Sequence, residues 1–241
     1  MLLSFLRGKK SMFKFSSVIE KVVLIYVVLL TLLGSFLAIF NQVYFDLSFS
    51  IEDGLLEWLQ FLGLVTISAI CFRRVFLLRK ERSIFFIALT FIVACFFVFA
   101  SGEEISWGQR LFGIKSSEFF AQNNVQGETN LHNLMVGKTK INKLIFSSGL
   151  AFIFTLYLVV ITPLYVRSAL VKKWVDYAGI PIPTAYQVLG YIFIVVLVEG
   201  IVHAFSATGR RGELTEFAAI YLVMLNVAFP ANPRLFTINK Q

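Results

Sequence analysis

Long apolar runs alternate with short polar segments along most of the chain, and this pattern predicts membrane-spanning helices. A lipid core about 30 Å thick requires about 20 consecutive apolar residues in a helix, and several runs reach that length with few or no charges. The pattern therefore predicts an all-α fold, a polytopic bundle of about six transmembrane helices in one membrane domain, 1–241. The predicted spans are 22–40, 54–72, 84–100, 144–165, 186–205 and 213–229.

The composition agrees with a chain that lies mostly in lipid. Hydrophobic residues make up 58% and charged residues 15%, which a soluble domain of this length could not cover with a polar surface. The net charge of +8 would suggest nucleic acid in a soluble protein, but here Lys and Arg stand in short clusters between apolar runs. We therefore interpret them as topology signals and expect no nucleic-acid partner. Cys71 and Cys95 both fall inside apolar runs, where neither a disulfide nor thiolate chemistry is expected.

The basic clusters set the predicted orientation. The N-terminal segment 1–14, the segment 73–82 (RRVFLLRKER) and the loop with Arg167, Lys172 and Lys173 fall on one side if six helices alternate. The positive-inside rule makes that side cytoplasmic, so both termini are predicted to be cytoplasmic. The first apolar run lacks a small-residue cleavage site after it and is predicted to be a retained helix.

The acidic residues are distributed in the opposite way. Apart from Glu20, Glu81 and Asp176, every Asp and Glu maps to the outer side or to the outer ends of the helices. The one long connection, 101–143, is predicted to be an outward-facing structured segment between the third and fourth helices. The simpler interpretation is that the outer loops are acidic and solvated.

The string GEEISWGQR, 102–110, begins where the third predicted helix reaches the outer interface. If the helix continues, Glu103 and Trp107 share one face and Glu104 lies beside them. Adjacent carboxylates at the edge of lipid are costly unless they are solvated, paired, protonated or bound to metal. A pairing with Arg110 is the simpler explanation.

Two Glu and His pairs share a spacing of four residues. Glu128 and His132 lie in NNVQGETNLHN, 123–133, while Glu199 and His203 close the fifth predicted helix. On a helix each pair would present a carboxylate oxygen and an imidazole nitrogen to one cation. The alternatives are that His203 is a helix-end histidine hydrogen-bonded to Glu199 and that His132 has a capping or loop role. The predicted ligands of a divalent metal ion, with zinc, manganese and iron as candidates, are Glu104, Glu128, His132, Glu199, His203 and Glu216.

Glu57 and Glu103 are the candidate catalytic residues. Glu57 lies about one turn into the second predicted span, and an ionisable group at that depth indicates a metal ligand or a general base. The alternative for Glu57 is a polar contact with Arg210 or Arg211 across the bundle.

The segment SATGRRGELTEF places two arginines beside the acidic outer face. They could hold an anionic group, such as a lipid phosphate or a lipid-linked sugar phosphate, through bidentate hydrogen bonds. The alternative is that they neutralise Glu213 and Glu103. The candidate substrate-binding residues are Arg210, Arg211, Trp107 and Gln109.

GEEISWGQR and NVQGETNLHN together resemble a signature of uncharacterised bacterial multispanning membrane proteins. This resemblance implies a bacterial membrane protein and brings no activity with it. The layout is also similar in outline to membrane metal hydrolases of the alkaline ceramidase kind. Those enzymes rely on three histidines, and this chain has two, so no residue is carried over from them.

The leading hypothesis is a multi-pass inner-membrane hydrolase that is metal-dependent and acts on a lipid or lipid-linked substrate at the outer face. A two-iron oxidoreductase is a variant, although the usual Glu–His spacing there is three, not four. Two hypotheses outside the enzyme class are a transporter or ion-conducting protein and a noncatalytic subunit of an envelope complex.

Overall fold

The computed structural model of the protein describes residues 17–131, 133–136, 139–140 and 150–238. The described residues form helices joined by turns, with one antiparallel pair of two-residue strands, β1 (Met135–Val136) and β2 (Thr139–Lys140). The predicted all-α class is therefore confirmed for this part of the chain. The helices are α2 (Val18–Phe40), α3 (Gln42–Tyr44), η2 (Phe45–Phe49), α4 (Leu55–Leu78), α5 (Ile84–Glu104), η3 (Ser106–Gly108), α6 (Gln109–Phe112), α7 (Glu118–Asn123), α8 (Leu150–Leu156), η5 (Tyr157–Ile161), α9 (Thr162–Arg167), α10 (Ala169–Ala178), α11 (Ala185–Ile194), η6 (Val195–Val202), α12 (His203–Phe205), α13 (Arg211–Ala228) and η7 (Pro233–Phe236).

Helices occupy the described part of every predicted span, although several of their first and last residues differ from the predicted ones. α4 continues for more than a turn beyond residue 72, the predicted end of the second span. The predicted start of the fourth span, residue 144, lies outside the described residues. The loop between the fourth and fifth predicted spans contains α10, which ends at Gly179 in the left-handed conformation.

Four helices in the described part of the chain are long and apolar enough to cross a membrane: α2, α4, α5 and the continuous helix Ala185–Phe205. A fifth span results if Ile153–Arg167 and Ala169–Ala178, which are bent by 116°, count as one. Between 22% and 33% of the apolar window of each long helix is buried inside the protein, so most of its side chains face outward. Only lipid solvates such a surface well. These helices make the chain a membrane protein.

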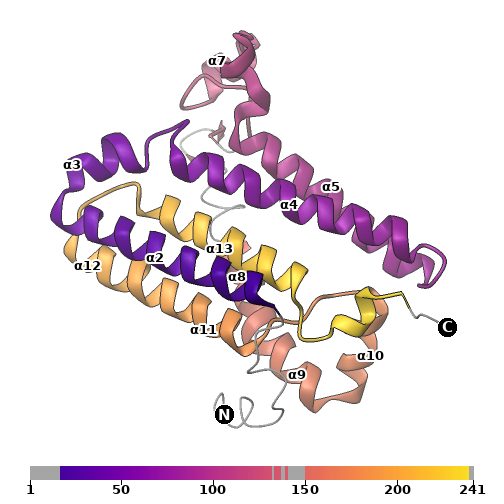
Figure 1. Ribbon diagram of the computed structural model, residues 1–241. Helices are drawn as coiled ribbons and strands as arrows, with labels where there is room; N and C mark the ends of the chain where they lie inside the picture. Colours follow the sequence, from indigo (N-terminus) through magenta and orange to yellow (C-terminus); the bar gives the residue numbers. More distant parts are fainter. Residues whose placement is uncertain (1–16, 132, 137–138, 141–149, 239–241) are drawn as a thin grey trace.

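α13 is the central helix of the bundle (Figure 1). It contacts α2, α4, α11 and η6, and its Leu214 and Phe217 are fully buried. Glycines let the neighbouring helices approach it closely, because a Cβ on Gly34 of α2 would stand 2.4 Å from a Leu214 methyl group. A Cβ on Gly63 of α4 would likewise stand 2.7 Å from Ile220.

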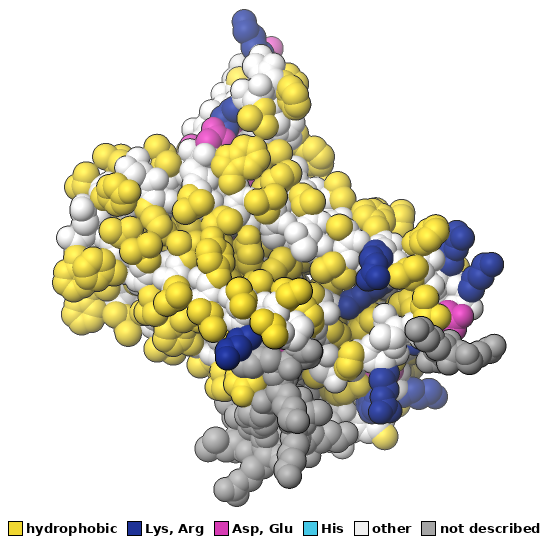
Figure 2. Space-filling view, viewed as in Figure 1, with side chains coloured by type: hydrophobic (Ala, Val, Ile, Leu, Met, Phe, Trp, Pro, Cys, Tyr) yellow, Lys and Arg dark blue, Asp and Glu magenta, His cyan; other side chains and the backbone are white. Residues whose placement is uncertain are grey.

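Charge separates along the bundle. Figure 2 shows a broad apolar surface over the helices, and most of the visible Lys and Arg side chains gather toward the end where α4 turns into α5. There Arg82 donates hydrogen bonds to the backbone carbonyls of Arg234 and Leu235, and Arg74 lies 3.8 Å from the centre of the Phe236 ring. These contacts attach the C-terminal segment to the basic end, and the carboxylates gather at the opposite end.

Candidate functional site

A cavity of about 920 Å³ lies at the acidic end of the bundle. It is bounded by the start of α4, the end of α5, η6, the start of α13 and the residues that follow α5, 105–131, which we call the cap. A cavity of this size can hold a small ligand or a lipid head group. The carboxylates in its wall are those of Glu52, Glu57, Glu103, Glu104, Glu128, Glu199, Glu213 and Glu216.

α5 extends four residues beyond residue 100, the predicted end of the third span, but it does not continue through GEEISWGQR. α5 stops at Glu104, because Ser106 and Trp107 have φ values of 48° and 55° and Gly108 follows at 73°. Three successive left-handed residues cannot continue an α-helix, and only the glycine adopts that conformation without strain. The condition on which Glu103 and Trp107 would share a helical face, a helix that continues past Glu104, is therefore not met.

Trp107 nevertheless meets Glu103, as a helical arrangement would also have required. The turn folds its ring back over Gly102, where a Cβ would stand 2.8 Å from ring carbons. The indole Nε1 donates to Glu103 Oε1 at 2.8 Å, and the backbone N–H of Leu131 donates to Glu103 Oε2 at 2.5 Å. Glu103 thus holds both ends of the cap.

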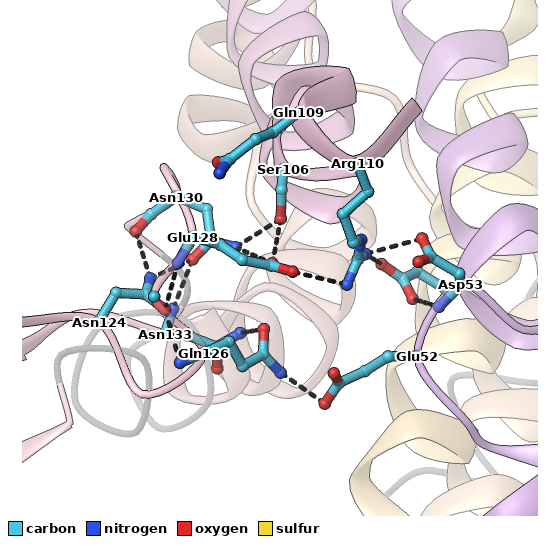
Figure 3. Close-up of polar contacts among 12 residues, drawn as sticks. Glu52, Asp53, Ser106, Gln109, Arg110, Asn124, Gln126, Glu128, Asn130 and Asn133 are labelled. Atoms are coloured by element: carbon cyan, nitrogen blue, oxygen red, sulfur yellow. Dashed lines mark hydrogen bonds and ion pairs between the residues drawn. The ribbon is translucent and has the colours of Figure 1, made fainter. Parts of the chain in front are cut away.

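Arg110 forms the central ion-pair cluster of the site (Figure 3). Its Nη2 lies 2.8 Å from Asp53 Oδ1 and 2.9 Å from Glu57 Oε1, and its Nη1 lies 2.8 Å from Glu128 Oε1. The sequence offered Arg110 as a partner of the adjacent carboxylates Glu103 and Glu104, and Arg210 or Arg211 as a partner of Glu57. The structure instead pairs Arg110 with Glu57. The cluster fastens the cap to the first turn of α4.

The polar string of the cap folds on itself around Glu128. Ser106 Oγ and Asn130 Nδ2 donate to the Glu128 carboxylate, the latter at 3.2 Å, and Asn124 Nδ2 donates to Asn130 Oδ1 at 2.8 Å (Figure 3). Glu128 lies in a turn, so the same-face argument for a helical Glu128 and His132 pair does not apply. His132 itself lies outside the described residues.

Both arginines of the α12–α13 connection are paired with carboxylates other than those expected. Arg210 Nη2 lies 3.3 Å from Glu52, which also accepts from Gln126, and Arg211 Nε lies 3.3 Å from Glu199. Neither arginine forms an ion pair with Glu213 or Glu103 in the described part of the chain. The pairs leave the terminal nitrogens of Arg211 without a bond to any described residue.

Two carboxylates of the cavity differ from the other six. Glu104 and Glu216 accept no hydrogen bond and form no ion pair with any described residue, although both line the cavity. Glu213 accepts from Gln60 Nε2 at 3.4 Å, and Gln60 Oε1 is buried without a hydrogen-bond partner. Glu104 and Glu216 are thus the least satisfied carboxylates of the cavity.

The cavity brings together most of the residues that the sequence singled out. Of the sequence-based set, the cavity is lined by Glu57, Glu103, Glu104, Glu128, Glu199, Glu216, Arg210 and Arg211. His203 is exposed and is not among the lining residues. Gln109 binds Ser116 and the Thr129 backbone within the cap. The sequence-based set omitted Glu52 and Glu213, although both stand at predicted outer helix ends.

No group of three or more His, Cys, Asp or Glu side chains within the described residues is placed to hold a metal ion. Comparisons with protein-family models, curated proteins and solved structures found no match to the chain. Fold and site therefore define the class on their own: a helical membrane protein with an acidic cavity at one end.

Proposed function

We propose that the protein is a membrane enzyme that binds a divalent cation in the acidic cavity and hydrolyses a lipid or lipid-linked substrate. The observation that carries the proposal is the pair of Glu104 and Glu216, whose carboxylates line the cavity without a partner among the described residues. Carboxylates withdrawn from bulk water are costly unless a positive charge or a hydrogen-bond donor compensates them. A cation between them supplies that compensation.

The donor set favours a hard cation. The unsatisfied groups are carboxylate oxygens, which suit magnesium, manganese or calcium better than zinc. Because no cluster of three protein ligands stands ready among the described residues, the best fit is an ion that keeps several waters. Magnesium is commonly held by one or two carboxylates together with substrate phosphates. A divalent cation would polarise the scissile group and lower the pKa of a bound water.

The surrounding residues suggest a division of roles. Glu57 and Glu103 each accept hydrogen bonds at both carboxylate oxygens, so we assign them to positioning the cap. The candidate general base is then the oxygen of Glu104 or Glu216 that does not bind the cation, since neither carboxylate accepts a hydrogen bond from a described residue. Arg211, with unused donors on its terminal nitrogens, is the candidate partner of an anionic head group.

The proposed enzyme spans the membrane six times, with α13 as the sixth span and both termini in the cytoplasm. The basic residues around the α4–α5 turn support this orientation, because positive charge is retained on the cytoplasmic side. The cavity, at the opposite end, then faces outward from the inner membrane.

A transport function receives less support from the packing. Between Glu216 and Asn226, about 15 Å apart along α13 at the α-helical rise, the buried side chains are all apolar. They are Phe217, Ala218, Leu222 and Leu225. A transport path needs polar groups through this layer. α13 offers no buried polar side chain within this layer.

Manganese binding tests the proposal directly. We would titrate Mn²⁺ into metal-free, full-length protein in nanodiscs and follow free Mn²⁺ by electron paramagnetic resonance, comparing the wild type with Glu104→Gln, Glu216→Gln and the control Glu118→Gln. Glu118 is exposed on α7, away from the cavity. We expect Mg²⁺ to compete, and each cavity variant to weaken binding by at least about tenfold while the control does not. Wild-type protein that is folded and binds no Mn²⁺ would contradict the proposal.

A second assay then addresses the reaction. Phosphate release from lipid-linked phosphates, measured with and without Mg²⁺ on the same variants, should depend on both Glu104 and Glu216. Metal binding without any release would retain the cation site and reject the hydrolase.

A further inference from the structure

The cap carries a projecting segment, residues 109–123, that leaves the bundle sideways (Figure 1). It contains α6 and α7 and exposes four large apolar side chains. Their exposed fractions are 62% for Leu111, 77% for Phe112, 58% for Ile114 and 59% for Phe119. Exposed apolar side chains gathered in one short segment indicate an interaction surface.

The position of the segment indicates what that surface meets. α5 leads into it through the turn at Ser106, and Figure 1 shows it crossing the direction of the α4 and α5 axes beside the start of α4. A segment with this direction runs along the boundary of the membrane, whereas a loop that continued the helix axes would enter water. Figure 2 shows the apolar surface of the helices extending onto this projection.

The side chains also have the chemistry of an interfacial element. Aromatic rings and aliphatic chains are interspersed with Lys115, which is exposed, and Trp107 lies half-exposed at the base of the segment. Tryptophan is enriched at membrane interfaces, and lysine extends its ammonium to the head groups while its stem stays in apolar surroundings. Interfacial anchors combine these features.

We propose that the projecting segment inserts Leu111, Phe112, Ile114 and Phe119 into the head-group and acyl boundary of the leaflet on the cavity side. It acts as an interfacial anchor that keeps the cap at the lipid surface. Arg110, at its base, transmits this position to the cavity wall through its ion pairs with Glu57 and Glu128. The inference rests on the shape and exposure of the segment and does not depend on the proposed enzymatic activity.

Spin-label accessibility in bilayers tests the anchor. Full-length protein carrying Cys95→Ala is suitable as the background, because Cys71 is buried and Cys95 is exposed. A nitroxide is attached at Phe112→Cys or Phe119→Cys, with Phe91→Cys as the lipid control on α5 and Lys80→Cys as the water control in the α4–α5 turn. Collision rates with molecular oxygen and with a water-soluble nickel chelate are compared in phospholipid nanodiscs.

Labels at Phe112 and Phe119 are expected to collide with oxygen in preference to nickel, as the label at Phe91 does. If both labels are as accessible to nickel as the label at Lys80, the segment lies in water and the proposal fails. If both are shielded from oxygen and nickel alike, protein covers the segment. That outcome also overturns the anchor, and dipolar broadening between labels would then identify a second copy of the chain as the cover.

Discussion

Replacement of Arg110 by alanine should release the cap from α4 while leaving the helical bundle folded. Arg110 contributes three ion pairs at 2.8–2.9 Å, and it joins Asp53 and Glu57 at the start of α4 to Glu128 in the cap. Alanine removes the guanidinium at the centre of this cluster and leaves three carboxylates facing one another. The variant therefore tests whether this cluster, and not apolar packing, holds the cap.

The expected loss follows from the exposure of each partner. The side chains of Glu57 and Glu128 are 14% and 11% exposed, and a hydrogen bond to a charged group contributes about 1.5–3 kcal/mol. Asp53 is 51% exposed, so its pair adds less than about 1 kcal/mol. Arg110 Nε is buried without a partner and offsets roughly 1 kcal/mol of this gain. With the lower value for each of the two bonds, the free energy of cap closure falls by at least about 3 kcal/mol.

Hydrogen exchange followed by mass spectrometry measures this loss locally. A change of about 3 kcal/mol in the closing equilibrium corresponds to roughly 100-fold faster exchange of the protected amides in the cap. Amides of α2 and α13 should exchange as in the wild type. Lys115→Ala is the matched control, because it also removes one positive charge from the cap and Lys115 is exposed.

A second variant separates the charges from the packing. Adding Glu128→Gln to Arg110→Ala removes one of the uncompensated carboxylates and should recover part of the protection, since deleting both partners costs less than deleting one. Exchange in the Arg110→Ala cap that matches the Lys115→Ala control would refute the assigned role of the cluster.

Three further substitutions test individual features. Gly102→Ala places a Cβ 2.8 Å from the Trp107 ring and should cost about 1–3 kcal/mol in thermal unfolding, whereas an unchanged midpoint would mean that the ring moves freely. Gly179→Ala combines a φ of 68° with a Cβ 2.6 Å from Phe86, so a larger loss of about 2–4 kcal/mol is expected in the same assay. His203→Ala should leave stability within about 0.5 kcal/mol and Mn²⁺ binding unchanged, because His203 is exposed and does not line the cavity. Loss of Mn²⁺ in that variant would return His203 to the set of ligands.

The helices were predictable because lipid imposes a simple requirement on them. Every apolar run that is long enough contains a helix in the described residues, and the acids gathered at one end as the charge pattern indicated. The central place of α13 was less visible, because its first turns carry Glu213 and Glu216. Only the packing of α2 and α4 against it, through Gly34 and Gly63, identifies it as the middle of the bundle.

The ion-pair partners could not be derived from the sequence. Charge pattern places Arg110, Arg210 and Arg211 on the same side as many carboxylates, and each arginine had several candidates there. The carboxylates that Arg110 contacts depend on the turn after α5, in which Ser106 and Trp107 have left-handed backbone conformations. Neither residue type signals that conformation, and Gly108 was the only local indication of it.

The spacing argument for the Glu and His pairs assumes a regular α-helix, and neither Glu128 nor Glu199 lies in one. Glu199 lies in η6, a π-helical stretch with i→i+5 hydrogen bonds, and His203 begins the short helix α12. Glu199 lines the cavity and binds Arg211, while His203 is exposed. η6 and the turn after α5 both border the cavity, whereas the π-helical η5 contributes no residue to its wall. Helical irregularities of this kind are frequent at functional sites, where the geometry of the site overrides local conformational preference. These two irregularities and the unpaired carboxylates Glu104 and Glu216 border the same cavity, in which we propose the activity.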